Sequence, residues 1–304
     1  MAGVRAVTAI SAAPARAFLR LVAIEHSVFA LPFAYLAGLT AMTVRDHRVN
    51  WAVLGLITVA MVGARTFAMA ANRIIDRQID ARNPRTARRE LVTGAVSLRT
   101  AWTGAAAALF VFLVAAAALN PLCLALAPLA LVPLVVYPYA KRFTSYPHAF
   151  LALAQLIGPV GAWLGVTGTL SGSGPAWVLG IAVGLWIGGF DLIYACQDAV
   201  VDREIGVRSV PARFGVAFAL RTSAVVHVVT FGMFVWFGVL VGLGGLWLVG
   251  LVLAAGAFVY EHAIVTPSDL SRVNRAFFTA NGFVGIALFV FALADLVVRL
   301  GLRA

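Results

Sequence analysis

Three oxygen-bearing side chains recur at intervals of four residues near the end of a long apolar run. They are Asn72, Asp76 and Asp80. Residues four apart in a helix lie on one face, so all three side chains would point the same way. Like charges at this spacing repel one another, and the repulsion grows beside an apolar medium. A bound cation would remove that cost, so the spacing predicts a cation site at a helix end.

A second acidic set lies about 120 residues further along, again at the end of an apolar run. It consists of Asp191, Asp198 and Asp202. Spacings of seven and eleven residues also keep three side chains within a narrow sector of one helical face. Carboxylate and amide oxygens, with no His or Cys among them, favour Mg²⁺ over Zn²⁺. Because Mg²⁺ is commonly shared between carboxylates and substrate phosphates, two facing sets would hold a diphosphate between them.

The alternative is that these acids are solvated loop charges, partly paired with nearby arginines such as Arg73 and Arg77. That interpretation suits one isolated pair of acids better than two sets facing the same compartment. Seven of the twelve acidic residues fall in or beside two loops. This concentration in a chain poor in charge favours a functional site.

Basic residues accompany the acids. Arg65 lies within an apolar run, two helical turns before Asn72 and on the same face. A charged residue inside a membrane span is costly and is a functional candidate. Lys141 and Arg142 end another apolar run, and both side-chain types bind phosphate oxygens. Snorkelling or anchoring at the membrane surface is the alternative explanation, and for Arg142 it is equally favoured.

The composition defines the elements that must position these residues. The chain has 304 residues, of which 62% are hydrophobic and only 12% are charged. A soluble domain has about 25% charged residues and needs polar outer faces on its helices. We therefore predict an all-α fold, a polytopic transmembrane bundle of about nine helices formed by a single domain over residues 1–304. The expected spans are 20–44, 51–72, 98–118, 121–140, 148–168, 176–196, 219–241, 244–264 and 275–298.

The basic residues predict the orientation of the bundle. The net charge of +11 would suggest nucleic acid on a soluble protein, but here the charge sits in short loops between spans. With the N-terminus in the cytoplasm, 18 Lys and Arg lie in inside segments and 4 in outside segments. We expect a multi-pass protein of the inner (plasma) membrane, with the lipid bilayer as its partner, its site toward the cytoplasm and no nucleic-acid partner.

These motifs resemble those of the UbiA superfamily of intramembrane prenyltransferases. Asn72-x-x-x-Asp76-x-x-x-Asp80 is similar to the first aspartate-rich motif of that superfamily, and Asp191-x-x-Tyr194-Ala-x-x-Asp198-x-x-x-Asp202 to the second. Tyr137-x-x-x-Lys141 resembles its Tyr-Lys element, and Arg65 stands at its upstream Arg position. The resemblance covers essentially the whole chain. Within the superfamily, the segment 208–215 resembles the 4-hydroxybenzoate polyprenyltransferase-like branch.

The resemblance implies helices around a central cavity and a role for each motif residue. Two Mg²⁺ ions and the diphosphate would be bound by Asn72, Asp76, Asp80, Asp198 and Asp202. Arg65 and Lys141 would hold phosphate oxygens, while Tyr137 and Tyr194 would be further binding residues. Asp191 would sit near the acceptor or assist its deprotonation.

The activity implied is Mg²⁺-dependent transfer of a polyprenyl group from polyprenyl diphosphate to an aromatic acid. The acceptor would be 4-hydroxybenzoate or 1,4-dihydroxy-6-naphthoate, in ubiquinone or menaquinone synthesis. A cation-coupled transporter is the main alternative, although the acids lie at one face rather than near the midplane and no repeated half is evident. A membrane phosphotransferase is a third interpretation, but it would need a different aspartate spacing.

Overall fold

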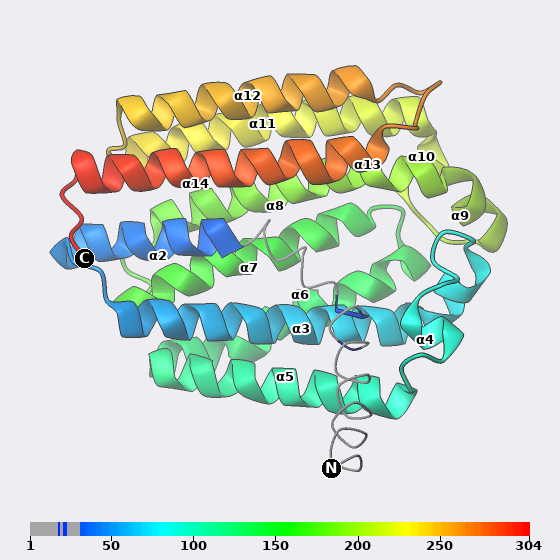
Figure 1. The fold of residues 1–304 in the computed structure, drawn as a ribbon, viewed down its shortest axis with the longest axis horizontal. Helices are drawn as coiled ribbons and strands as arrows, with labels where there is room; N and C mark the ends of the chain where they lie inside the picture. Colours follow the sequence, from blue (N-terminus) through cyan, green and yellow to red (C-terminus); the bar gives the residue numbers. More distant parts are fainter. Residues whose placement is uncertain (1–17, 19–20, 23–30) are drawn as a thin grey trace, which may run out of the picture.

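A computed structural model describes residue 18, residues 21–22 and residues 31–304, and its regular elements are helices. The long helices run side by side along the longest axis of the molecule (Figure 1). They are α2 (Leu31–Asp46), α3 (Trp51–Arg82), α5 (Leu98–Leu119), α6 (Pro121–Phe143), α7 (Pro147–Thr167), α8 (Gly174–Ala195), α11 (Val216–Val241), α12 (Gly245–Ile264) and α14 (Asn281–Val298). The short elements are α4 (Glu90–Thr93), the 3₁₀ turn η2 (Cys196–Asp198), α9 (Ala199–Ile205), α10 (Val210–Phe214), α13 (Val273–Arg275) and the π-helical η3 (Ala276–Ala280).

Eight helical segments in the described residues are long and apolar enough to cross a membrane. They coincide with the second to ninth spans expected from the sequence. The first expected span, 20–44, corresponds in its described part to α2, and residues 23–30 lie outside the described part of the chain. The prediction of a polytopic bundle of about nine helices is therefore confirmed.

Helix α8 lies at the centre of the bundle, between α7 and α11. Most of its residues are buried, and it is apolar on all sides, as expected for a helix surrounded by others. Three glycines four residues apart, Gly180, Gly184 and Gly188, face α7. A Cβ at Gly184 would lie only 2.5 Å from the carbonyl oxygen of Ala152. These glycines let the two backbones approach closely, which is how membrane helices gain packing energy without a hydrophobic drive.

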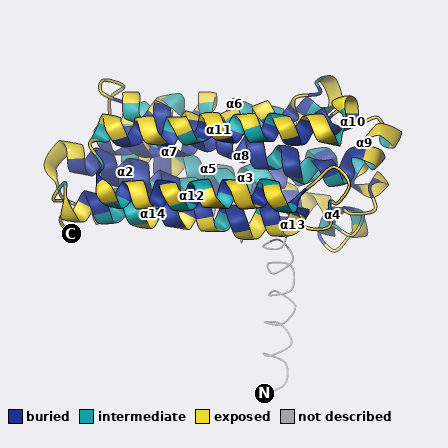
Figure 2. Ribbon diagram, turned by 90° about the horizontal axis from the view of Figure 1, so that it is seen from above, coloured by how far each residue is buried: buried dark blue, intermediate teal, exposed yellow. Residues whose placement is uncertain are grey.

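An aromatic cluster joins α8 to α2 and α11. Phe33 packs edge-on against Trp186, with ring centroids 5.2 Å apart, and stacks on Phe234 at 5.7 Å. All three side chains are buried, whereas the outer faces of α11 and α12 are largely exposed (Figure 2). Apolar residues exposed on an outer face are expected where lipid replaces water as the solvent.

The two ends of the bundle differ. The short helices α4, α9 and α10 gather at one end, and the C-terminus lies at the other (Figure 1). At the C-terminal end, the amide of Arg303 donates to the carbonyl of His47 at 2.9 Å, and the amide of Val49 donates to the carbonyl of Arg303 at 2.8 Å. The end with the short helices carries the acidic sets.

Candidate functional site

A polar cavity opens among the helix ends and loops at this end of the bundle. Nine of the predicted site residues line it. They are Asn72, Asp76 and Asp80 from α3, Tyr137 and Lys141 from α6, Asp191 and Tyr194 from α8, Asp198 from η2, and Asp202 from α9. The fold thus brings two acidic sets that are distant in the sequence to the same cavity.

The first acidic set lies on the last turns of α3, which has 32 residues and extends beyond the expected end of its span at residue 72. Asp76 is fully buried and contacts two bases from the end of α6. Its Oδ2 lies 2.7 Å from Nζ of Lys141, and its Oδ1 lies 3.3 Å from a guanidinium nitrogen of Arg142. Asp80 is paired with Arg89 at 2.5 Å. A buried carboxylate needs such partners, because an unpaired charge away from water is very costly.

The spacing predicted that the second set would lie on one continuous α-helix, but in the structure that helix is interrupted. Helix α8 ends at Ala195, a 3₁₀ turn contains Asp198, and α9 carries Asp202. Even so, Asp191, Asp198 and Asp202 all line the polar cavity, because the interruption is only three residues long.

The loop after α3 supplies the partners of Asp198. Nε of Arg85 donates to Asp198 Oδ1 at 2.9 Å, and another guanidinium nitrogen donates to Oδ2 at 2.5 Å. Nδ2 of Asn83 also donates to Oδ1, at 3.1 Å. Burial lowers the pKa of the Arg85 guanidinium, but the hydrogen bonds to Asp198, together with the charges of Tyr194, Asp198 and Asp202, outweigh burial and leave that pKa raised. Arg85 is therefore a permanent cation on the second acidic set.

Tyr194 and Asp202 complete this side of the cavity. The guanidinium of Arg85 lies over the Tyr194 ring, 5.1 Å from its centroid, and donates to its hydroxyl at 3.1 Å. Asp202 accepts a hydrogen bond from the hydroxyl of Ser209 at 3.1 Å. Ser209 also accepts from the amide of Ala212, so it caps α10 as well.

Asp191 has a partner that the sequence did not single out. Nδ1 of His148 lies 2.7 Å from Asp191 Oδ2. An ionised carboxylate can only accept, so the His148 ring donates its Nδ1 proton to Asp191. His148 is buried on α7 and also lines the cavity. The pair fixes the orientation of the Asp191 carboxylate.

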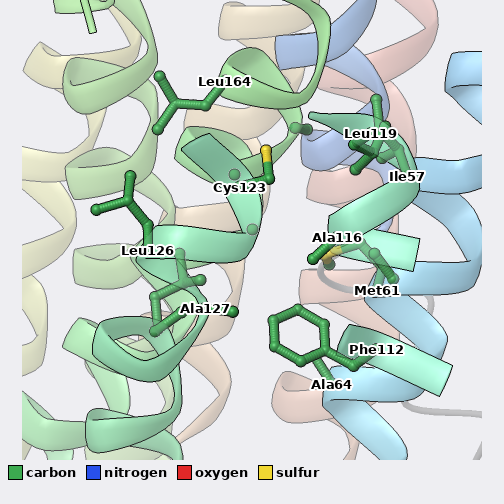
Figure 3. A pocket seen from close by; sticks show the side chains of 16 residues that line it. Ile57, Met61, Ala64, Phe112, Ala116, Leu119, Cys123, Leu126, Ala127 and Leu164 are labelled. Atoms are coloured by element: carbon green, nitrogen blue, oxygen red, sulfur yellow. The ribbon is translucent and has the colours of Figure 1, made fainter. Parts of the chain in front are cut away.

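Arg65 does not line the polar cavity. It lines a mainly apolar cavity deeper in the bundle, which shares Asn72 and Tyr137 with the polar one. A third, apolar cavity adjoins the second and shares Met61, Ala64, Ile157 and Gly158 with it. Figure 3 shows this innermost cavity, where Phe112, Ala116 and Leu126 come from α5 and α6. Polar and apolar spaces therefore follow one another along α3.

The interpretation of the acids as loop charges paired with Arg73 and Arg77 does not match the hydrogen bonds that these two arginines form. Nε of Arg73 donates to the carbonyl of Leu21 and Nε of Arg77 to that of Leu91. The acids contact Arg85 and Arg89 from the loop after α3, and Lys141 and Arg142 from the end of α6, instead. Residue type and spacing offered no reason to choose Arg85 and Arg89 among seven arginines between residues 73 and 99. Their only signal is position, since both lie in the loop that directly follows the first acidic set.

Comparisons with known proteins agree with this geometry. The sequence pattern of the UbiA prenyltransferase family matches residues 30–283. A 4-hydroxybenzoate octaprenyltransferase of Nitrosospira multiformis is 32% identical over 247 residues, covering 81% of this chain and 84% of the relative. One of Burkholderia multivorans is 30% identical over 275 residues, covering 90% and 93%.

Solved structures show the same fold. A UbiA homologue from Aeropyrum pernix superposes with a TM-score of 0.81 at 36% identity, covering 90% of this chain and 98% of the other. A UbiA homologue from Archaeoglobus fulgidus, solved with DMAPP and Mg²⁺, superposes with a TM-score of 0.70 at 20% identity, covering 92% and 99%. The match over most of the chain, together with two acidic sets around one cavity, places this protein in the UbiA prenyltransferase family.

Proposed function

We propose that this prenyltransferase moves a polyprenyl group from polyprenyl diphosphate to an aromatic acid acceptor in quinone synthesis, with Mg²⁺ as its cofactor. The observation that carries the proposal is the sequence of cavities along α3. A charged cavity suits a diphosphate and an aromatic acid, and the adjoining apolar cavities suit an isoprenoid tail. A transporter would have no need of an apolar space ending within the bundle, and the family favours prenyl transfer.

The donor atoms of the polar cavity fit Mg²⁺. Five carboxylates and two side-chain amides line one space, and hard oxygen donors are what Mg²⁺ prefers. The residues that would hold the ions are Asn72, Asp76, Asp80, Asp198 and Asp202. When bound, Mg²⁺ would supply positive charge to the leaving diphosphate.

The bases beside these acids would bind the diphosphate directly. Lys141, Arg85 and Arg89 each contact a carboxylate of the proposed ligand set. With Mg²⁺ bound to the carboxylates, these cations would be available for phosphate oxygens within the same cavity. Arg65 lines the apolar cavity that adjoins the polar one, where it would bind the end of the diphosphate that joins the tail.

Asp191 and His148 would handle the proton of the acceptor. Ionisation of the carbon–oxygen bond of an allylic diphosphate gives an allylic cation, which an electron-rich ring attacks. A proton then leaves the ring. Asp191 has the open carboxylate edge to take a proton, because His148 holds only its Oδ2. The apolar walls exclude water, which would otherwise trap the cation as an alcohol.

The names of the relatives favour 4-hydroxybenzoate as the acceptor over 1,4-dihydroxy-6-naphthoate. The orientation that the basic residues predict would place the polar cavity at the cytoplasmic side of the inner membrane. Both aromatic acids and diphosphates are charged, so access from the aqueous side suits them.

The decisive experiment combines the purified protein, Mg²⁺ and a polyprenyl diphosphate with each acceptor separately, and identifies products by mass spectrometry. We expect a prenylated 4-hydroxybenzoate. Prenylated 1,4-dihydroxy-6-naphthoate alone would replace the acceptor but keep the reaction. Cation-driven uptake in vesicles with no prenylated product from any acceptor would overturn the proposal.

A further inference from the structure

Three potential metal ligands converge outside the polar cavity, between α11 and α12. They are His227, Glu261 and His262, whose ligand atoms lie within 4.8 Å of one another. His227 and Glu261 are buried, whereas the His262 side chain is 21% exposed. The proposed prenyl transfer uses none of these residues, so the cluster calls for an explanation of its own.

The hydrogen bonds of His227 define which of its nitrogens faces the cluster with a lone pair. Its Nε2 lies 3.2 Å from the carbonyl oxygen of Trp186, which can only accept, so Nε2 carries the proton. In the neutral ring, Nδ1 then has a lone pair. That atom lies 2.7 Å from Glu261 Oε1 and 3.0 Å from His262 Nε2. With this tautomer, the lone pair of His227 Nδ1 faces the acceptor oxygen Oε1 of Glu261 without a proton between them.

A second layer of hydrogen bonds holds the ligands in place. Asn281 donates from Nδ2 to the other carboxylate oxygen of Glu261 at 2.9 Å and accepts from Trp186 Nε1 at 2.7 Å. Asn281 follows the π-helical turn η3, and it also donates to the carbonyl of Ala276 at 3.0 Å. The ring of His227 lies against Gly189, where a Cβ would come within 2.4 Å of Nε2. Such outer contacts are typical of metal sites, where they fix the tautomer and direction of each ligand. A π turn in a helix is itself frequent at functional sites.

We propose that His227, Glu261 and His262 bind a divalent transition-metal ion, with Zn²⁺ the ion that fits best, at a site separate from the Mg²⁺ site. Two imidazoles and a carboxylate are a donor set that Zn²⁺ favours, and that Mg²⁺ does not. Ligands about 2.0–2.1 Å from a tetrahedral ion lie about 3.3 Å from one another. The observed separations of 2.7, 3.0 and 3.9 Å fall on both sides of that value. Small side-chain rotations would therefore complete the site.

The position of the site indicates what the ion does. His227 belongs to α11, the other two ligands to α12, and the outer contacts come from α8 and α14. One ion would therefore tie four helices together. The exposed side of His262 gives the ion a path of entry and leaves room for water as the fourth ligand.

The site also has a physical connection to the polar cavity. A chain of aromatic rings leads from Trp186 through Phe190 and Phe277 to Tyr194. The successive ring centroids are 5.3, 5.0 and 4.3 Å apart. Tyr194 lines the cavity, and Phe190 directly precedes Asp191. An ion in the cluster would therefore restrain the part of α8 that carries Asp191 and Tyr194.

The test measures metal content and thermal stability of the full chain, purified without a polyhistidine tag and kept in excess Mg²⁺ to saturate the acidic sets. After treatment with a chelator, Mg²⁺ is restored in excess, Zn²⁺ or Co²⁺ is added and unbound ion is removed. We expect one equivalent of Zn²⁺ per chain, visible absorption from tetrahedral Co²⁺, and a rise of several degrees in melting temperature with Zn²⁺.

Matched variants locate the ion. Glu261→Gln and His262→Ala should each fail to bind the equivalent of Zn²⁺ and should show no rise in melting temperature with Zn²⁺. His47→Ala, which removes an exposed histidine at the opposite end, should retain both. Asn281→Ala should keep the ligands but weaken the affinity for Zn²⁺ by about 10–100-fold.

Two results would overturn the proposal. One is a parent protein that binds no Zn²⁺ beyond the level of Glu261→Gln. The other is a rise in melting temperature that persists in His262→Ala. Either would mean that the cluster is a hydrogen-bonded network in which Glu261 or an imidazole carries an additional proton. Because the readouts are metal content and stability, the proposal stands or falls independently of prenyl transfer.

Discussion

At the scale of single residues, the polar cavity is defined by how its charges are paired. The carboxylates of Asp76, Asp80 and Asp198 each contact a Lys or Arg, which comes from the end of α6 or from the loop after α3. Removing one carboxylate would remove a proposed metal ligand and also leave a partly buried cation without its partner. Substitutions of the acids should therefore be costly even when the size of the side chain is kept.

Asp76→Asn and Asp198→Asn should each lower prenyl transfer by about 10²–10³-fold, the usual cost of one lost electrostatic contact in an active site. Asp76→Ala and Asp198→Ala should lower prenyl transfer by the same factor. The assay is product formation at saturating substrate, after each variant has been shown to fold. Normal transfer by both Ala variants would mean that the proposed site is wrong.

Asp269 provides the control for this prediction. Hydrogen bonds from Ser271 hold the pKa of the Asp269 carboxyl below its usual range, so the group is charged, yet it is exposed and lies in the loop after α12. Asp269→Ala should leave transfer unchanged. Loss of activity in this variant would show that any missing negative charge harms the protein.

Asp191→Asn should separate binding from chemistry. If Asp191 takes the proton of the acceptor, diphosphate affinity should survive while transfer to the ring falls. His148→Phe removes the donor to Asp191 and should lower the maximal rate with little change in diphosphate affinity. His148→Asn, which keeps a donor near the same position, should recover part of that loss. Equal loss of diphosphate affinity in all three variants would contradict this division of roles.

At the scale of elements, the apolar runs and the breaks between them were sufficient for most of the long helices but not for their interruptions. The seventh expected span, 219–241, for example, corresponds to Val216–Val241, whereas α3 extends to Arg82, ten residues past the expected end of its span. Apolar length defines these elements, because a membrane span must satisfy its own backbone. The 3₁₀ turn at Cys196–Asp198 and the π turn at Ala276–Ala280 depend on tertiary packing, for which a helical period carries no signal.

The same distinction applies to the site. Types and spacing were enough to single out Asp76, Asp80, Asp198 and Asp202, because four carboxylates near a membrane are costly without a purpose. His148 could not be found in this way. A single histidine has no spacing partner, and its contact with Asp191 spans 43 residues and two helices. The roles of all these residues remain predictions.

Gly184→Ala should disturb the α7–α8 contact. A Cβ there would lie 2.5 Å from the carbonyl oxygen of Ala152, and overpacking of this kind costs about 1–3 kcal/mol. Gly232→Ala on α11 is the matched control, since a Cβ there meets nothing within 4 Å. We expect a lower melting temperature for Gly184→Ala, and an unchanged or slightly higher one for Gly232→Ala. Equal effects would show that close packing at α8 is not what the glycine provides.

At the scale of the whole molecule, the acidic sets and the bases gather at one end of a bundle that lies in lipid along its length. The reaction should therefore depend on a metal supplied from the aqueous phase. Treatment with EDTA should abolish transfer, and Mg²⁺ or Mn²⁺ should restore it. Full activity in a preparation shown to be free of metal would rule out the proposed ligand set.

The orientation of the bundle can be tested separately. The bias of 18 basic residues to 4 predicts that the end bearing the acidic sets faces the cytoplasm. A single cysteine placed in the segment 82–88, in a background lacking Cys123 and Cys196, should be protected from membrane-impermeant reagents in intact cells. Ready labelling from outside would reverse the orientation.

The contact between residues 47–49 and Arg303 has a consequence for the order of assembly. It joins the turn before α3 to a segment that leaves the ribosome after every described helix. Contacts between residues so far apart in sequence form slowly, because a long loop must close first. The helices that carry the polar cavity can therefore insert and pair while the opposite end of the bundle is still open. That end closes only after translation has passed residue 303, so a ribosome stalled near residue 298 should hold a protein with its acidic sets in place and its far end unsealed.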